Sequence, residues 1–169
     1  MLTFLVPVVV MLGFFIGVLL ARISPEEMHS GKRYFIWLIR LVVLIIIVSL
    51  FYIAGFGTVG LLLGLVFGFF VREYYFALGL AMAVALTVSK DVFFLFSALG
   101  FSFGVVYGTV SYITGRFTFT NVFTKIAFFF LPFCILFIEV PSQPLLLFAA
   151  GVLITILAVK NLPNLHVES

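Results

Sequence analysis

Charged side chains are scarce in this chain of 169 residues, because Asp, Glu, Lys and Arg together make up 9%. Hydrophobic residues make up 65% of the chain, and the mean hydropathy is +1.41. A soluble domain has about 25% charged and about 45–50% apolar residues. So few polar side chains cannot cover a water-soluble globule of this size. High hydrophobicity also excludes an intrinsically disordered chain, which leaves a polytopic membrane protein.

Cysteine and histidine are nearly absent. Cys134 is the single cysteine, so an internal disulfide and a cysteine-based metal site are both excluded. Cys134 lies in an apolar run, where a thiol packs as a small hydrophobic group. The two histidines, His29 and His166, are far apart in polar segments and do not form a ligand set. We therefore predict no metal site and no cofactor.

The chain also lacks the usual catalytic motifs. It contains neither H-E-x-x-H, typical of metal hydrolases, nor the G-x-S-x-G nucleophile motif. No Asp, Glu or Lys lies near the middle of a predicted span, so a proton relay and a retinal Schiff base are not expected. The one acid/base cluster, Glu26, Glu27 and His29, reads as a helix cap in a solvated loop. We assign no catalytic residue, and the sequence favours a protein without enzymatic activity over an enzyme.

Positive charge is in excess, with a net charge of +3. The nine lysines and arginines are scattered between apolar runs and form no basic stripe, so a nucleic-acid partner is rejected. The expected partners are the lipid bilayer and, in addition, another membrane protein or a second copy of the chain.

Long apolar segments define the predicted fold. A helix needs about 20 apolar residues to cross a hydrocarbon core of about 30 Å. Seven segments approach this pattern: Leu2–Leu20, Tyr34–Ile53, Thr58–Val71, Tyr74–Val88, Val92–Ile113, Val122–Ile138 and Pro144–Val159. Their connections are short, and no change in composition marks a second domain. The sequence predicts an all-α transmembrane helix bundle with about seven spans, forming one domain over residues 1–169.

The positions of the cations predict the orientation. With the N-terminus outside and seven crossings, eight lysines and arginines face the cytoplasm and only Lys90 faces outward. Merging residues 58–88 into one re-entrant unit without a net extra crossing would split them five against four. The positive-inside rule therefore favours seven spans with a cytoplasmic C-terminus. We expect the plasma membrane.

Helix starts and breaks are marked by polar residues and proline. Residues 24–27, Ser-Pro-Glu-Glu, form a capping box and predict a short cytoplasmic helix that ends near Gly31. Asp91 and Asn121 are predicted to cap the segments that follow them. Pro132 is predicted to kink the segment in which it lies.

Glycines recur every four residues on several predicted helix faces. Small residues at this spacing let transmembrane helices approach closely. The predicted helix-packing residues are Gly13, Gly17, Gly60, Gly64, Gly68, Gly100, Gly104 and Gly108. They predict either packing within the chain or contact with a second subunit.

Two of the segments, residues 58–71 and 74–88, are short for a crossing. Short or broken spans point to the binding region of a transporter, although local thinning of the bilayer or a misplaced boundary explains them as well. Five cations are candidate contacts for an anionic headgroup or substrate: Arg22, Lys32, Arg33, Arg40 and Lys125. For Arg40 and Lys125 the alternative is a side chain that reaches back to the interface.

Aromatic side chains near the ends of the predicted spans are interpreted as anchors at the membrane interface. These are Tyr34, Trp37, Tyr74 and Tyr75.

Three functional hypotheses follow from the sequence. The first is a small membrane transport or channel-like subunit, with a polar cavity between the segments at 58–71, 74–88 and 92–113. The second is a non-catalytic membrane scaffold or assembly protein that pairs through glycine-rich helix faces. The third is a lipid-modifying enzyme that uses Glu26, Glu27 or His29.

Overall fold

The chain is almost entirely helical in a computed structural model. The structure describes residues 5–55, 57–115, 117–137 and 141–161; at 29, 135, 137, 160 and 161 it describes the backbone alone. These ranges form eight α-helices and one 3₁₀ helix: α1 (Val6–Ile23), α2 (Pro25–Ser30), α3 (Lys32–Ala54), α4 (Thr58–Phe70), α5 (Tyr74–Val88), α6 (Lys90–Ile113), α7 (Phe119–Phe130), η2 (Leu131–Phe137) and α8 (Ser142–Asn161).

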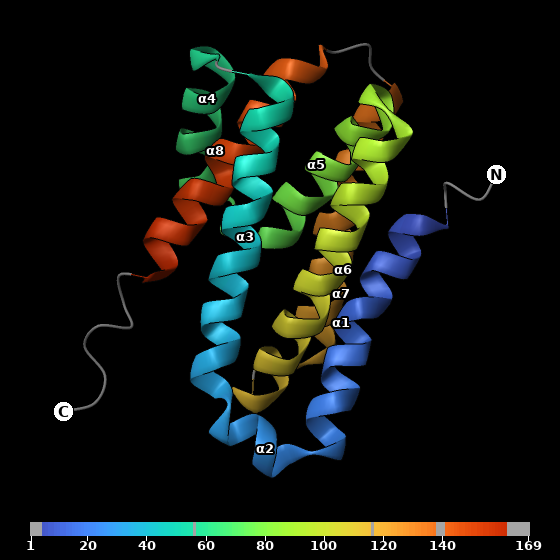
Figure 1. Cartoon of the computed structure of the whole chain (residues 1–169), viewed down its shortest axis with the longest axis vertical. Helices are drawn as coiled ribbons and strands as arrows, with labels where there is room; N and C mark the ends of the chain where they lie inside the picture. The colour runs from blue at the N-terminus through green and yellow to red at the C-terminus, as the bar shows by residue number, and fades with distance from the viewer. Residues whose placement is uncertain (1–4, 56, 116, 138–140, 162–169) are drawn as a thin grey trace.

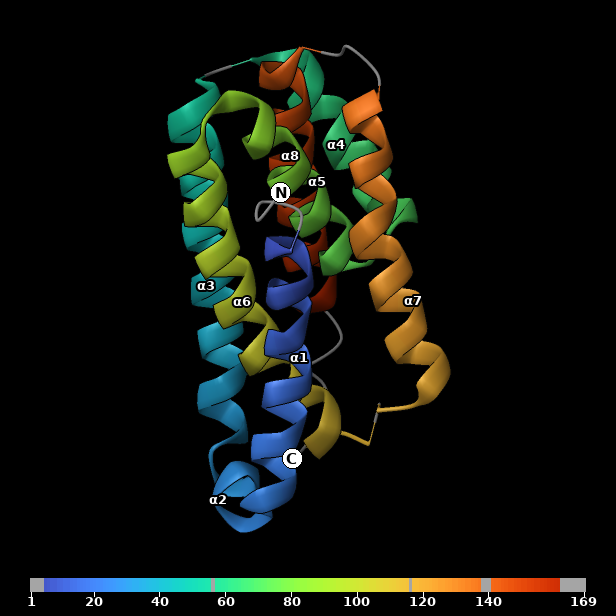
Figure 2. The ribbon, with the colours of Figure 1, turned by 90° about the vertical axis from the view of Figure 1, so that its right-hand side faces the viewer.

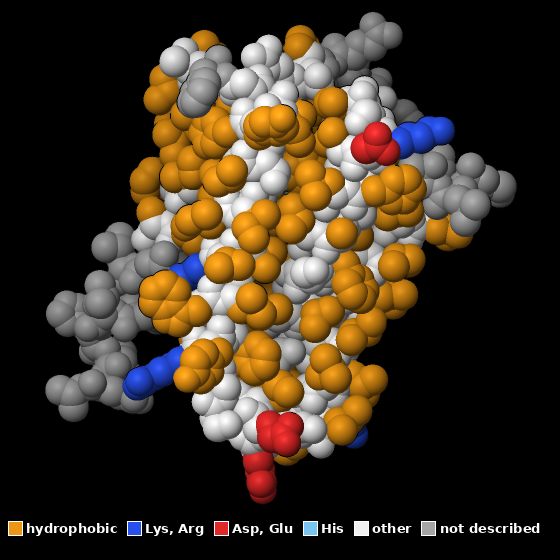
Figure 3. All heavy atoms as spheres, viewed as in Figure 1, with side chains coloured by type: hydrophobic (Ala, Val, Ile, Leu, Met, Phe, Trp, Pro, Cys, Tyr) orange, Lys and Arg blue, Asp and Glu red, His pale blue; other side chains and the backbone are white. Residues whose placement is uncertain are grey.

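Four of these helices, α1, α3, α6 and α8, are long and apolar enough to cross a membrane. On the face seen in Figure 3, apolar side chains cover the middle of the molecule and acidic side chains lie near its two ends. A surface this apolar is typical of a protein embedded in lipid. The prediction of an all-helical membrane bundle is confirmed at this level, whereas seven full crossings and the orientation of the termini are not confirmed.

Helices α4 and α5 form a hairpin that occupies the half of the bundle opposite α2 (Figures 1 and 2). They have 13 and 15 residues, which correspond to about 20 and 22 Å. Residues 71–73 join them without helical structure, and this turn is here called the hairpin tip. Helices α3 and α6 extend past the tip toward α2, so the hairpin is shorter than the bundle around it (Figure 1).

Helices α1 and α6 pack as a close parallel pair. Gly13 lies against Phe101, and Gly17 lies further along α1 against Val105. From α6, Gly108 lies against the backbone of Phe14. Thr109 donates a hydrogen bond of 3.0 Å from its hydroxyl to the carbonyl oxygen of Gly17. The glycines remove the side chains that would otherwise separate the two backbones.

Helices α4 and α8 form a second parallel pair of the same kind. Gly60 lies against the backbone of Pro144, Gly64 against Phe148, and Gly68 against Thr155. Here too a threonine joins the helices, because the Thr155 hydroxyl donates a hydrogen bond of 2.9 Å to the carbonyl oxygen of Leu65 on α4.

The predicted helix starts are correct in part. Helix α2 begins at Pro25 and ends at Ser30, in agreement with the capping box. The caps predicted at Asp91 and Asn121 are wrong, because each helix begins earlier in the chain. Ser89 caps α6 by accepting from the amide of Val92, and Thr118 caps α7 by accepting from the amide of Asn121.

Pro132 changes the type of helix in the segment where we predicted a kink. The α-helical hydrogen bonding of α7 ends at Phe130, and a 3₁₀ helix continues over η2. Proline has no amide hydrogen and its ring crowds the preceding turn, so it does not continue an α-helix.

Candidate functional site

The hairpin tip lies inside the bundle, away from its α2 end. The ring of Tyr74, the first residue of α5, lies 5.5 Å from that of Phe103 and 6.1 Å from that of Tyr107, both on α6. Tyr107 stands six residues before the end of α6. On the other side, Arg40 of α3 acts electrostatically on Tyr74 and stands eight residues after the start of α3. At 1.5 Å per residue, the tip therefore lies roughly 9–12 Å inside the helix ends that flank α2.

Polar side chains from four helices and the tip meet at this depth. They include cations, a carboxylate, an amide and phenol groups, and we call them the tip cluster: Arg40 of α3, Glu73 of the tip, Tyr74 and Tyr75 of α5, Tyr107 of α6, and Asn121 and Lys125 of α7.

Lys125 is the most deeply buried cation of the tip cluster, with 2% of its surface exposed. Its ammonium group donates a hydrogen bond to the side-chain oxygen of Asn121, one turn earlier on α7. The same ammonium lies 5.7 Å from the centre of the Tyr107 ring. This is the distance of a cation–π contact. Lys125 therefore faces the protein interior. The alternative prediction, a side chain that reaches back to the membrane interface, does not describe this position.

Glu73 and Tyr75 each bring an oxygen that lacks a hydrogen-bond partner. Tyr75 is 1% exposed, and its ring lies 5.7 Å from that of Tyr107. The Tyr75 hydroxyl and Oε2 of Glu73 are buried and make no hydrogen bond within the part of the chain that the structure describes. The Glu73 carboxylate is also close enough to act electrostatically on Tyr75. A buried polar atom without a partner is costly, so the tip cluster holds two unsatisfied oxygens.

Two arginines add positive charge near the tip. Arg40 is half-buried, and its guanidinium carbon lies 5.2 Å from the centre of the Trp37 ring. Arg72, in the tip itself, is exposed and donates a hydrogen bond of 3.3 Å from Nε to the carbonyl oxygen of Phe69. Three cations, Arg40, Arg72 and Lys125, thus outnumber the one carboxylate at this level of the bundle, and this excess of positive charge favours an anion.

The structure divides the five predicted anion contacts into two groups. Arg40 and Lys125 join the tip cluster. Arg22, Lys32 and Arg33 are exposed at the end of α1 and the start of α3, beside α2. The structure therefore brings two of the five together around the hairpin tip and leaves three at the end of the bundle.

Sequence reasoning missed several members of the cluster: Glu73, Tyr107 and Asn121. It also interpreted Tyr74 and Tyr75 as interface anchors, which is wrong, because they are only 5% and 1% exposed. One signal was present: an Arg-Glu pair stands between two apolar segments that are both too short to cross.

The acid/base cluster of the enzyme hypothesis lies elsewhere. Glu26 and Glu27 are exposed on α2, and the side chain of His29 lies outside the described residues. Within the described ranges, no group of three His, Cys, Asp or Glu side chains is placed to hold a metal ion.

The predicted helix-packing glycines are all buried within the chain. Gly13 and Gly17 face α6, and Gly60, Gly64 and Gly68 face α8. The three glycines of α6 face α1 in turn: Gly100, Gly104 and Gly108. That these residues determine the stability of the two pairs stays a prediction.

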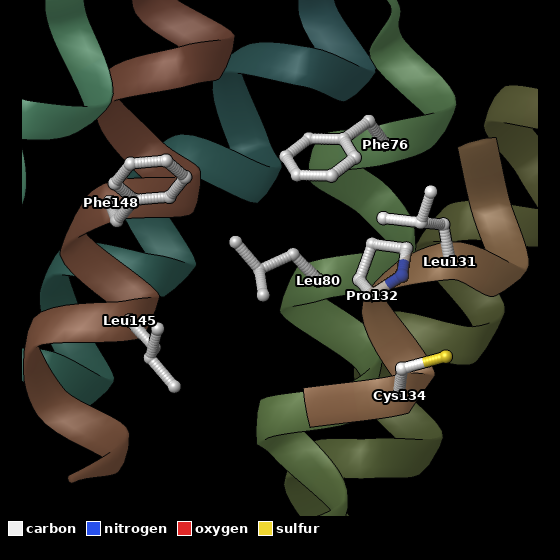
Figure 4. A pocket seen from close by; sticks show the side chains of 7 residues that line it. All are labelled: Phe76, Leu80, Leu131, Pro132, Cys134, Leu145 and Phe148. Carbon is white, nitrogen blue, oxygen red and sulfur yellow. The ribbon is translucent and has the colours of Figure 1, made fainter. Parts of the chain in front are cut away.

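An apolar cavity of about 370 Å³ opens between α5, η2 and α8. Figure 4 shows Phe76 and Phe148 at one end and Leu145 and Cys134 at the other. The lining consists of Phe76, Leu80, Leu131, Pro132, Cys134, Leu145 and Phe148. Phe76 directly follows Tyr75 on α5, but its ring packs against Phe67 and Phe128, and no residue of the tip cluster is among the lining residues.

A second cavity, of about 390 Å³, lies between α3 and α6 near the end opposite α2. Its lining is largely apolar and includes Tyr52, Leu95 and the carboxylate of Asp91. Neither cavity is the polar one expected between the segments at 58–71, 74–88 and 92–113. In place of a polar cavity, the structure has the polar side chains of the tip cluster packed against one another.

The chain matches no protein-family model, no curated protein and no solved structure. Function is therefore inferred from the tip cluster.

Proposed function

We propose that this protein is a small membrane transport subunit that moves an anion by way of the tip cluster. In this proposal, the α4–α5 hairpin enters the membrane from outside, and its tip reaches toward the cytoplasm without crossing to the surface. The α2 end, with Arg22, Lys32 and Arg33, is cytoplasmic, as the positive-inside rule indicates.

The observation that carries the proposal is the short hairpin with a charged tip inside the bundle. Non-helical backbone at membrane depth is tolerated only where it is buried in protein or lines a water-filled cavity. Discontinuous helices of this kind hold the binding sites of many transporters. Ionisable groups within the membrane are costly and are most often functional. Arg72 and Glu73 are ionisable residues in a non-helical turn, so both observations apply to the hairpin tip.

Charge at the tip favours an anion as the transported species. Arg40 lies near Tyr74, Lys125 lies over the ring of Tyr107, and Arg72 stands in the tip itself. Phenol, amide and ammonium groups are all donors, and charge-assisted donors bind anionic oxygen most strongly. Helix α5 also begins at the tip, and the positive end of its dipole acts in the same direction.

The two glycine-packed pairs provide the frame for this site. Helix α6, in the first pair, carries Tyr107. Helix α4, in the second pair, ends at the tip. Because the glycines face partners within the chain, they offer no open face for the scaffold hypothesis.

Purified protein in liposomes tests the proposal with two readouts. One measures efflux of radiolabelled phosphate, and the other measures movement of a fluorescent phospholipid between the two leaflets. We expect at least one flux to exceed that of empty liposomes. A Lys125→Met variant, which keeps the length of the side chain and removes its charge, should lose that flux, while Lys32→Met at the exposed α2 end should keep it. No flux above empty liposomes in either readout would contradict the proposal.

A further inference from the structure

The second cavity, between α3 and α6, is lined by polar side chains at one end and by apolar side chains at the other. Helix α3 ends and α6 begins at the end of the bundle opposite α2 (Figure 1). Tyr52 stands two residues before the end of α3, and Asp91 is the second residue of α6. Val48 and Leu95 line the cavity one helical turn further along, which is about 6 Å closer to the middle of the bundle.

Asp91 brings to this cavity a carboxylate that α6 does not use as its cap. The Ser89 hydroxyl caps the helix by accepting from the amide of Val92. The Asp91 side chain is exposed, and no ion pair joins it to a lysine or arginine among the residues that the structure describes. Its negative charge can therefore attract a cation from outside the chain.

Tyr52 adds an aromatic ring at the rim of the cavity. It is 90% exposed, and the face of a phenol ring attracts a cation. The Ser49 hydroxyl donates a hydrogen bond of 2.8 Å to the carbonyl oxygen of Ile45, and its oxygen can still accept one. The described residues that line the cavity include neither lysine nor arginine, so the polar end suits a positively charged ligand.

We propose that the second cavity binds a phospholipid with an ammonium headgroup, taken from the leaflet at the end of the bundle opposite α2. The ammonium lies at Asp91 and Tyr52, and one acyl chain passes Val48 and Leu95. Lys90, exposed beside Asp91 in the chain, matches the sign of the phosphate in such a headgroup. This site is separate from the proposed transport site, because no residue of the tip cluster lines the second cavity.

The size and surroundings of the cavity favour a lipid over a soluble amine. Its volume of about 390 Å³ falls within the range of about 300–1,000 Å³ found for small-molecule sites, so an ammonium group alone would leave most of it empty. Leu44 and Leu41 continue the face of α3 on which Val48 lies, and they are 54% and 55% exposed. An acyl chain can extend along this face toward the middle of the bundle.

Native mass spectrometry of the detergent-purified protein tests the role of the carboxylate. The two probes have identical chains: phosphatidylethanolamine, and phosphatidylglycerol, an anionic lipid with the same phosphate and a glycerol in place of the ammonium. Asp91→Asn keeps the shape of the side chain and removes its charge. We expect this variant to retain phosphatidylethanolamine about fivefold less tightly, as the loss of an exposed ion pair predicts, and to retain phosphatidylglycerol as before. Glu27→Gln, which neutralises an exposed carboxylate on α2, should change neither.

A matched pair of valines tests the cavity itself. Val48 lines it and is 58% exposed, whereas Val59 lies on α4 outside it and is 69% exposed. Val48→Trp fills the apolar end without disturbing a buried position, and it should weaken phosphatidylethanolamine binding several-fold. Val59→Trp should not change it.

Three results would overturn this site. Equal retention of phosphatidylethanolamine by the wild-type protein and Asp91→Asn would remove the carboxylate from it, and equal effects of the two tryptophans would remove the cavity. Full competition by soluble phosphoethanolamine would identify a soluble amine in place of a lipid. The flux of the wild-type protein and of Lys125→Met is measured separately, so the lipid site and the transport proposal can fail independently.

Discussion

The two parallel glycine-packed pairs, α1–α6 and α4–α8, share the same local packing but differ in where the first helix of each pair stops. In each pair, glycines four residues apart bring two backbones together, and a threonine hydroxyl bonds across to the partner's carbonyl. Helix α1 runs on to Arg22 at the α2 end of the bundle. Helix α4 stops at Phe70, and Arg72 follows within the bundle. Both arginines are exposed, but the same motif followed by arginine marks the end of the bundle in one region and a turn partway along it in the other.

Alanine in place of the central glycines should give the largest effects on stability. A Cβ at Gly17 would overlap the carbonyl oxygen of Val105, and one at Gly64 would overlap that of Phe148. Because backbone cannot move aside as a side chain does, we expect each variant to lose about 3 kcal/mol of unfolding free energy. Unfolding in mixed micelles measures this loss.

Gly100→Ala is the control for both variants. Its Cβ would meet only side chains, Val10 at 3.0 Å and Met82 at 3.8 Å, so we expect a loss below about 1 kcal/mol. A loss at Gly100 equal to that at Gly17 would mean that glycine content, and not backbone contact, sets the stability of the pair.

Neutralising the arginine that follows each motif should separate the two regions by function. Arg72→Gln removes a cation at the hairpin tip, and a cation near an anionic lipid is worth about 1 kcal/mol, so anion binding should weaken about fivefold. Arg22→Gln, at the exposed end of α1, should leave binding unchanged. Titration of both variants with phosphatidylglycerol measures the difference, and equal affinities would remove Arg72 from the site.

The interhelical threonine bonds should give the smallest and most similar effects. Thr109→Val and Thr155→Val each remove one hydrogen bond between helices, which in membrane proteins averages about 0.6 kcal/mol. We expect both variants to lose stability by this amount in the same unfolding assay. A loss several times larger in the α4–α8 pair alone would indicate that Thr155 also supports the hairpin tip.

Helix positions could be predicted from the sequence better than their depth in the membrane. The apolar segment predicted at Tyr74–Val88 matches α5, and Thr58–Val71 differs from α4 by one residue. Hydropathy reports where a helix is apolar but not the level at which it ends. For this reason the sequence predicts two crossings over residues 58–88, where the structure has two short helices of 13 and 15 residues joined at the hairpin tip.

Counting cations could not correct this interpretation. A hairpin that enters and leaves by the same side removes two crossings, so every other charge stays on the side assigned to it. Only Arg72 changes place, from the cytoplasmic surface to the tip. The split of five against four is therefore wrong for such a hairpin, because it treats residues 58–88 as a single crossing. The positive-inside rule fits five crossings with a hairpin as well as it fits seven.

The tip cluster could be predicted only in part, because its members come from four helices and the tip. Arg40 and Lys125 stood out as charges within apolar segments. Tyr107 and Asn121 carry no signal of their own, since their roles depend on how α6 and α7 pack against the tip.

The depth of residue 72 in the bilayer decides between a hairpin and two full crossings. Arg72→Cys and Arg22→Cys, each in a Cys134→Ser background, can carry a fluorescent label whose quenching by lipids brominated at different chain positions reports depth. We expect the label at 72 to lie about 10 Å deeper than the label at 22. Equal depths at the cytoplasmic interface would contradict the hairpin and the site built on it.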